Sequence, residues 1–444
     1  MEESASMEIQ LAIASINNED QYTRKEAAIL GKKEKKNDEL VIEIREIVGR
    51  LDIQSSTRCR IYRVPHYLRK WNEEAYTPQV ISIGPFHHKN KRLKAMEELK
   101  ERYFSSFVKR TKINLDDLVG KIREMEKRIR GCYDETIDLS SDRFVKMILV
   151  DASFILELLE RSSKGLTSDD PMAVEPRATA IMLDLLLLEN QLPFFVIKKL
   201  HHLAFPSLSN ALLQHTLIYF GKYICNQFIQ RNPDVKIKHF TDLLRTFMLP
   251  PPVVRPESVI EQSQHTKLLY SATQLREAGV KFKVVESECR FDINFEKGVL
   301  KIPSLELMAW TEVVTRNIMA LEQTHYIKDT YFTDYLILMD SLINTREDVD
   351  LLCKKKILVN YLGDNNAAMS MINNLNNGIT WITTRKDYID LYKKLNSFYE
   401  IPWHKWKATL RRQYFSTPWR AASTVAAIIL LVLTFIQTIC SIIK

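Results

Sequence analysis

The chain has 444 residues and a mass of 51.9 kDa, which exceeds one ordinary domain. Hydrophobic residues make up 45% and charged residues 27%, so most of the chain can bury a core and wholesale disorder is excluded. Glycine is scarce, with 11 residues, and the closest pair lies eleven positions apart. That spacing excludes the Gly-rich loops that cradle dinucleotides and nucleoside triphosphates. The composition favours helices over a sandwich or barrel.

The cysteines and the N-terminal region narrow the class of protein further. The six cysteines are 64 to 93 residues apart, so neither a disulfide framework nor a zinc module is indicated. The first ten residues have no basic start and no long apolar run, unlike a signal peptide. Residues 1–50 are densely charged, which predicts a mobile tail with some helical character over 39–48. The chain contains no Asn-x-Ser/Thr glycosylation acceptor.

Residues 51–90 are loop-rich, because three prolines punctuate two short apolar runs that fit strands or extended segments. Helical spacing then begins. It predicts helices over 93–107, 115–129, 143–159, 177–200 (interrupted near Pro193) and 211–229. A Pro-rich stretch near 249–265 breaks this periodicity and predicts a mobile loop or a subdomain boundary.

The period changes near 280–303. Val280, Phe282 and Val284 alternate with lysines, and a second alternating run ends in a turn that contains Gly298. This pattern predicts a small antiparallel β-meander. The helical spacing flanking it predicts further helices over 268–277, 305–321, 331–342, 347–356, 367–376 and 388–414.

The strongest signal is an uncharged run of 23 residues, 421–443. As a helix it would extend ~34 Å, enough to cross a bilayer core of about 30 Å. Residues 401–420 carry five basic side chains and no acid, interleaved with aromatic rings that suit the lipid headgroup layer. The pattern predicts a single-pass tail anchor in the plasma membrane or an endomembrane, with the bulk of the chain in the cytosol. The alternative is a buried helix of a globular domain.

Polar or small residues mark one face of this span: Ser423, Ala427, Thr434, Gln437, Thr438 and Ser441. Polar side chains in lipid seek partners on another helix, which favours self-association. The alternative is that the Ser and Thr hydroxyls bond to their own backbone.

Two acids within apolar runs are candidates for acid–base chemistry. Glu189 follows four leucines, and Asp151 lies in a second apolar run. Burial raises the pKa of a carboxyl group, so the pair could serve a membrane-tethered hydrolase. The commoner role is structural: such acids bond to backbone freed by Pro193, or to a buried arginine such as Arg177. We therefore assign no catalytic residue.

Two further features invite functional readings. Neighbouring residues on a helix point about 100° apart, so the pairs His87–His88 and His201–His202 are not expected to share a metal ion, and no cofactor is expected.

Residues 87–131 hold fourteen Lys or Arg against seven acids. This fits either the solvated side of two amphipathic helices or an anionic-lipid-binding regulator. No nucleic-acid partner is expected.

Six segments together carry a family resemblance: Cys59–Pro65, Asn72–Pro78, Ile81–His88, Leu187–Phe195, Ala272–Phe282 and Arg316–Gln323. Their order and spacing resemble those of the plant DUF-247 family (uncharacterised protein family 0481). The chain departs from the family pattern at Ala152 and Lys356, where glycine is expected. The resemblance implies a plant protein with a C-terminal membrane helix and no established enzyme activity. Some grass members are associated with self-incompatibility in pollen, which implies recognition or signalling.

Together these features predict a mainly α fold: a charged tail over 1–50, a large helical domain over 51–420 and a transmembrane helix over 421–443. The expected function is non-enzymatic interaction, recognition or signalling at a membrane, through a protein partner or self-association.

Overall fold

The computed structural model describes residues 40–42, 44–45, 61–165, 170, 174–206, 211–221, 236–250, 267–287, 291–379, 385–414 and 418–443. It forms two units, Met1–Arg58 and Cys59–Lys444. Residues 40–42 and 44–45 of the first unit are helical. The rest of the expected charged tail lies outside the described residues. All elements from α2 onward belong to the second unit.

The second unit is mainly helical, which confirms the expected fold class. Its N-terminal elements are α2 (His66–Arg69), η1 (Glu74–Tyr76), η2 (Lys91–Leu93), α3 (Lys94–Thr111), α4 (Leu115–Arg130), α5 (Ser141–Lys164), α6 (Glu175–Asp184), α7 (Phe194–Ala204), α8 (Ala211–Tyr219) and α9 (Phe240–Met248). The helices predicted from 93, 115 and 143 correspond to η2–α3, α4 and α5. The helix predicted over 211–229 is described only through α8 and the two residues after it.

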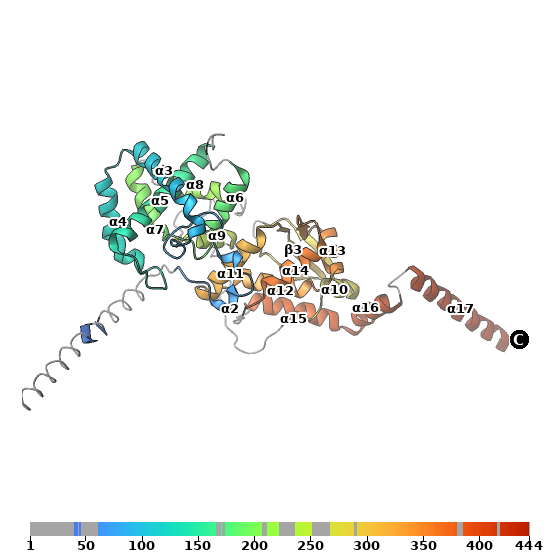
Figure 1. The fold of residues 1–444 in the computed structure, drawn as a ribbon. Coiled ribbons are helices and arrows are strands. Elements are labelled where there is room, and N and C mark those ends of the chain that lie inside the picture. The colour runs from blue at the N-terminus through green and yellow to red at the C-terminus, as the bar shows by residue number, and fades with distance from the viewer. Residues whose placement is uncertain are drawn as a thin grey trace, which may run out of the picture. The chain divides into compact units, whose positions relative to one another are not determined.

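Helix α5 is the centre of this N-terminal part. Helices α3, α4, α7 and α8 pack against it, and α3, α4 and α5 lie side by side in Figure 1. The three- and four-residue spacing of apolar side chains explains the packing, because it gives each helix one continuous buried face. On α4 that face contains Leu118, Ile122 and Ile129, all fully buried.

The C-terminal elements are α10 (Ala272–Ala278), β1 (Lys281–Val285), β2 (Asn294–Glu296), β3 (Val299–Pro303), β4 (Leu305–Leu307), α11 (Thr311–Thr324), α12 (Tyr331–Leu342), α13 (Arg346–Lys354), β5 (Leu358–Asn360), α14 (Asn365–Leu375), α15 (Lys386–Glu400), α16 (Pro402–Tyr414) and α17 (Pro418–Ile443). A second apolar cluster, distinct from the one around α5, joins α10, the strands and helices α12 to α15. Of the Pro-rich loop, only residues 249 and 250 are described.

The strands differ in topology from the predicted meander. Strands β2 and β3 form the expected antiparallel hairpin, with Phe295 opposite Leu300. Strand β1 pairs with β3 in parallel, so the sheet order is β1-β3-β2 and the sheet is mixed. The period-two pattern identifies strands but carries no information about their direction. A second small sheet pairs β4 with β5 in parallel, from residues for which no strand was predicted.

Three predicted helices are split or begin as another element in the structure. The one over 305–321 begins as β4, and its helix, α11, starts at Thr311. The one over 388–414 is two helices, because Ile401 is extended and Pro402 starts α16 as its first residue, where proline is tolerated. The one over 177–200 is also two helices, α6 and α7, with nine non-helical residues between them.

Candidate functional site

The nine residues between α6 and α7, 185–193, are buried yet not helical. Pro193 has no N–H to donate and disfavours helical geometry in the residue before it. The Gln191 side chain takes over part of the lost backbone bonding: its Nε2 donates to the carbonyls of Leu185 and Leu187, both at 2.7 Å. Its Oε1 accepts from the Phe240 N–H at 2.9 Å, which ties this turn to the start of α9.

Glu189 lies at the centre of this turn, and its side chain is fully buried. Its Oε1 accepts from the Val64 N–H at 2.7 Å and from Arg69. Its Oε2 accepts from Arg63 Nη1 at 3.0 Å and lies 3.2 Å from His87 Nε2. Burial by itself would raise the pKa of Glu189, but the hydrogen bonds from His87 and Arg69 and the positive charge of Arg69 lower it to about 2. The group is therefore an ionised structural anchor at neutral pH.

Glu189 does pair with arginine, as expected, but its partners are not Arg177. Arg63 and Arg69 supply the two guanidinium groups, from before and within α2. Sequence reasoning missed both, although Arg63 lies inside the first segment of the family resemblance.

Two neighbours of Glu189 bind a second extended segment, residues 79–84. Asp184 accepts from the N–H groups of Gln79, Val80 and Ile81 at 2.7 to 2.9 Å. Burial raises the pKa of Asp184 to about 6, although those three donors oppose the rise. Asn190 Oδ1 accepts from the Ile83 N–H at 2.7 Å. These side chains supply the bonds that a neighbouring strand would otherwise provide.

Asp151, the second candidate acid, lies on α5 and is also fully engaged. Its Oδ1 accepts from Lys100 Nζ at 2.5 Å, and its Oδ2 accepts from the Gly84 N–H at 2.8 Å. Lys100 is buried and also donates to the Ser82 carbonyl. Burial would lower the pKa of Lys100, but the negative charges of Asp151 and Glu97 raise it. The helical spacing of α3 places position 100 on its buried face, a signal that the sequence analysis did not use.

The structure brings five of the six resemblance segments together around these acids. Arg63, Glu189 and His87 join the first, fourth and third segments. Asn317 joins the last segment to the others, since its Oδ1 accepts from the Leu188 N–H and its Nδ2 donates to the Ala75 carbonyl. What these segments share is therefore a buried polar framework that holds extended backbone in place.

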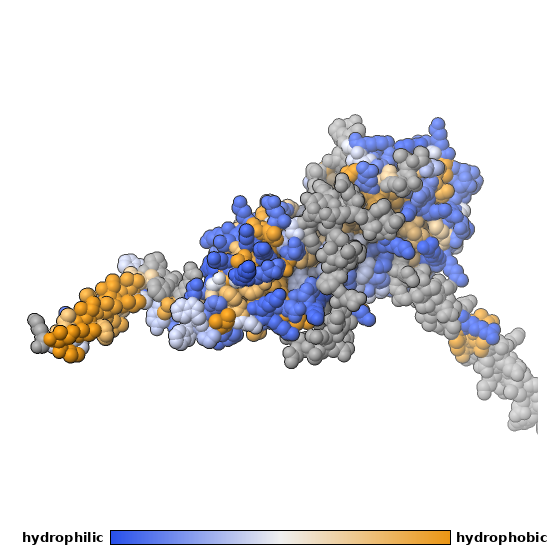
Figure 2. Space-filling model, turned by 180° about the vertical axis from the view of Figure 1, so that it is seen from behind, coloured by the Kyte–Doolittle hydropathy of each residue, from blue (hydrophilic) through white to orange (hydrophobic). Residues whose placement is uncertain are grey.

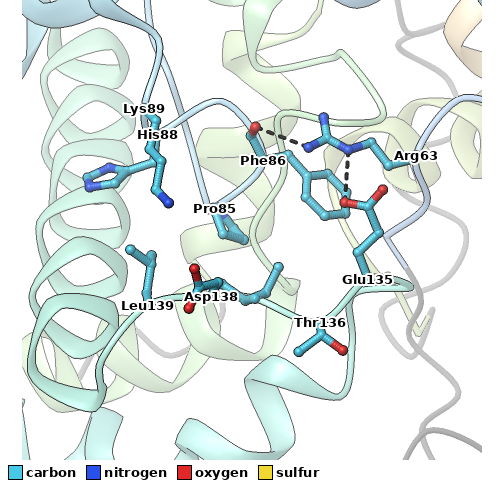
Figure 3. Close-up of a pocket in the computed structure, with 10 residues that line it drawn as sticks. Arg63, Pro85, Phe86, His88, Lys89, Glu135, Thr136, Asp138 and Leu139 are labelled. Atoms are coloured by element: carbon cyan, nitrogen blue, oxygen red, sulfur yellow. Dashed lines mark hydrogen bonds and ion pairs between the residues drawn. The ribbon is translucent and has the colours of Figure 1, made fainter.

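A small polar pocket of about 190 Å³ opens beside this framework. Figure 3 shows Arg63 over the Phe86 ring, 4.2 Å from its centroid, with its Nε donating to Glu135 at 3.1 Å. His88, Lys89 and Leu139 lie on the opposite side of the pocket from Glu135. Neither Glu189 nor Asp151 lines it. The pocket could admit a few waters or a small polar group.

The histidine pairs do not converge on a common point with other ligands. Among the described residues, no group of three or more His, Cys, Asp or Glu could hold a metal ion. His87 contacts Glu189, whereas the rings of His201 and His202 are 6.4 Å apart and meet edge to face. His201 packs instead on Phe205, with centroids 5.1 Å apart.

The basic region 87–131 contributes part of its charge to internal pairing. Lys100 is buried against Asp151, Arg110 pairs with Glu157 on α5, and Arg130 pairs with Glu126 within α4. Arg130 also donates to the carbonyls of residues 137 and 139. These pairings weaken the lipid-binding reading of this region.

Helix α17 is long and apolar enough to cross a membrane, over Trp419–Ile443, and none of its apolar window is buried. Its surface is apolar along its length (Figure 2). Within the polar stripe, the hydroxyls of Thr434, Thr438 and Ser441 donate to the carbonyls four residues earlier at 2.8 to 2.9 Å. That bonding matches the second of the two readings given above for the stripe.

Comparison with known proteins identifies the family of this chain. Residues 61–433 match the family DUF247, described as a plant protein of unknown function. The chain is 27% identical to the UPF0481 protein At3g47200 of Arabidopsis thaliana, over 89% of this chain and 88% of the relative. It is 25% identical to the putative UPF0481 protein At3g02645 of the same plant, over 85% and 89%. No solved structure matches. The chain belongs to the DUF247 family of plant proteins.

Proposed function

We propose that this protein is a single-pass membrane protein that presents a folded, non-enzymatic interaction domain to the cytosol. The observation that carries the anchor is α17, whose apolar side chains are exposed throughout Trp419–Ile443. Twenty-five apolar-rich residues without a burial partner suit lipid rather than water. The basic residues before the span favour a cytosolic location for the body.

The interaction role is supported by how the candidate acids are used. Each carboxylate oxygen of Glu189 and Asp151 already accepts a hydrogen bond from a cation or a backbone N–H. A general acid or base must instead reach a substrate proton. Neither acid lines the polar pocket, so the hydrolase alternative finds less support. Family membership is consistent with a role as a recognition or signalling protein.

Fractionation tests the anchor. The full chain should sediment with membranes and resist alkaline carbonate, whereas a chain ending at Arg420 should be released. A double substitution, Leu430→Arg with Leu431→Arg, is the matched control in a full-length chain. It should also release the protein, because each arginine costs about 2.5–3.5 kcal/mol at the centre of a span. Carbonate extraction of the full chain would reject the anchor.

Orientation can be read from glycosylation. The chain has no acceptor of its own, so an Asn-Gly-Thr acceptor on a short extension after Lys444 reports unambiguously. We expect glycosylation of that acceptor and none of one inserted after Lys89. The reverse pattern would place the body in the lumen.

Self-association through the polar stripe is the finer proposal for α17. Since Thr434, Thr438 and Ser441 bond to their own helix, Gln437 is the strongest remaining candidate for a bond between helices. Crosslinking in membranes should lose the dimer on Gln437→Leu and keep it on Ile436→Leu. An equal dimer yield in both variants would remove the idea. Proximity labelling with the full chain and the chain ending at Arg420 would then identify partners that depend on the anchor.

A further inference from the structure

Helix α16, which precedes α17, has two unlike faces. Trp403, Trp406, Leu410 and Tyr414 recur at three and four residues, so they form one stripe along the helix. Their exposed fractions are 71%, 73%, 52% and 49%. A stripe of exposed tryptophan, leucine and tyrosine on one helix is unusual on a surface that faces only water.

The opposite face of α16 is docked on the folded body. Ala408 lies roughly 155° around the helix from the centre of the stripe and is buried. His404 Nδ1 lies 2.8 Å from the Phe398 carbonyl, and the rings of these two residues are 4.1 Å apart. On the flank between this buried face and the stripe, Lys407 Nζ lies 3.6 Å from where a Cβ on Gly279 would stand, at the C-terminal end of α10, where a cation is favourable. Helix α16 is therefore fixed to α10 and α15 rather than being a loose linker.

The end of α16 also lies close to the start of α17. The Thr424 hydroxyl, on the second turn of α17, donates to the Arg420 carbonyl of its own helix at 2.8 Å and lies 3.2 Å from the Tyr414 carbonyl. Four peptide steps separate Tyr414 from Pro418, which span at most ~14 Å. If α17 crosses a bilayer, Tyr414 must lie within about 14 Å of the residue at which that span begins.

The charges on α16 match a membrane surface of one sign. Lys405, Lys407 and Arg412 are on this helix, and no acid lies between residues 401 and 420. Basic side chains beside aromatic rings are the composition of helices that lie in the headgroup layer of anionic bilayers.

We propose that α16 is an interfacial brace: its Trp403–Trp406–Leu410–Tyr414 stripe inserts into the headgroup layer of an anionic lipid leaflet. Because its other face is docked on α10 and α15, the brace holds the C-terminal part of the body against the membrane in one orientation. This inference rests on the proposed anchor, and it adds a second lipid contact, parallel to the surface. It also defines which part of the body a membrane partner would meet.

The test uses the full chain reconstituted in vesicles of phosphatidylcholine with phosphatidylserine, containing lipids brominated near the headgroup. Bromine quenches tryptophan only at short range. We expect quenching in the wild type, and loss of most of the quenchable signal in the double variant Trp403→Phe, Trp406→Phe. The matched control, Trp71→Phe, removes an exposed tryptophan from the end of α2 and should leave the quenched signal unchanged.

Sedimentation of the same vesicles separates the two proposals. If the protein sediments but the quenched signal is the same in wild type and double variant, the brace is wrong and the anchor stands. If the protein does not sediment, both fail. If Trp403 and Trp406 are shielded from bromine but crosslink to a second copy, the stripe is a dimer interface and the lipid proposal is overturned. Quenching that is equal without phosphatidylserine would reject the requirement for anionic lipid.

Discussion

In two segments of the N-terminal part of this fold, side chains make the backbone hydrogen bonds that a helix or a strand would otherwise make. Residues 61–64 and 79–84 belong to no helix or strand; Ile61 makes only an isolated bridge with Tyr133. Their backbone N–H groups are instead bonded to carboxylates and amides of the turn that contains Glu189. A buried acceptor in such a position is costly to alter, because it leaves buried backbone N–H groups such as that of Val64 without a partner.

Glu189→Gln tests this role. The variant removes the charge that neutralises Arg69 and, together with Glu135, Arg63, so we expect the free energy of unfolding to fall by about 3 kcal/mol. Urea unfolding of the full chain in mild detergent, followed by tryptophan fluorescence, measures it. Glu101→Gln is the control: its exposed pair with Lys146 is expected to contribute less than about 1 kcal/mol. Equal effects of the two variants would contradict the structural role.

Gly84 shows a second residue-scale constraint. Its φ is +73°, and a Cβ there would lie 2.6 Å from the Gln191 carbonyl oxygen. Gly84→Ala should therefore cost roughly 3 kcal/mol or more, from both backbone strain and the clash. Gly165→Ala is a matched control, since Gly165 has φ +84° but nothing within 4 Å. It should cost only the backbone strain, about 1–3 kcal/mol, without the clash. Similar losses in the two variants would show that strain alone matters.

The candidate acids were foreseeable as residues, but their partners were not. An acid after four leucines must be buried, and a buried acid must be bonded. The partners Arg63, Arg69 and Lys100 come from segments more than 50 residues away from Glu189 or Asp151. Only the tertiary fold brings these residues close to the acids, so local sequence patterns cannot predict the pairs.

At the scale of elements, helix ends show where the chain accepts strain. Helix α10 ends in a Schellman motif, with Gly279 in the left-handed region at φ +114°. Helix α13 ends in the same way: Lys356 N–H donates to the Cys353 carbonyl and Ile357 N–H to the Leu352 carbonyl. Its left-handed residue is Lys356, at φ +57°. Lys356, one of the two positions where the family pattern has glycine, therefore adopts the left-handed conformation that favours glycine.

Lys356→Gly should relieve that strain. A non-glycine residue in the left-handed region costs about 1–2 kcal/mol, part of which glycine loses again through its freer unfolded chain. We expect a net gain of about 0.5–1 kcal/mol in the free energy of unfolding, measured by urea unfolding. Lys355→Gly is the control, because Lys355 has φ −89° and glycine there should only destabilise. A loss of stability in Lys356→Gly would show that the lysine side chain has a role that outweighs the strain.

Element prediction succeeded where one periodicity ran undisturbed, as in α3, α4, α5 and α12. It failed where side-chain bonds or a parallel partner overrode local preference. Residues 185–192 have helical composition but bond through Gln191 and Glu189, and Leu305–Leu307 becomes a strand because Leu358–Asn360 lies beside it. Both outcomes depend on residues distant in sequence.

At the scale of the whole molecule, acid sensitivity follows from buried histidine. His239 is fully buried at the start of α9, where its Nδ1 accepts from the Asp242 N–H at 3.3 Å. Burial lowers the pKa of His239 to about 4, although the charge of Asp242 opposes this. Asp184 has the opposite effect on stability. Because its pKa in the folded state is raised to about 6, the folded state binds a proton at a higher pH than the unfolded state does, and this favours folding as the pH falls.

The contribution of His239 can be isolated with His239→Asn, because asparagine can still cap α9 but does not titrate. The unfolded histidine takes up a proton below about pH 6.5, and the folded one only near pH 4, so the contribution of His239 to the stability of the wild type is lost as pH falls through this window. At about pH 5 the loss should be ~2 kcal/mol relative to neutral pH. In the variant, any packing cost is the same at both pH values and cancels, so its pH dependence should be weaker by that amount. Urea unfolding at both pH values measures the difference, with His66→Asn, an exposed histidine, expected to keep the wild-type profile. An unchanged pH profile in His239→Asn would show that the ring is charged in the folded protein.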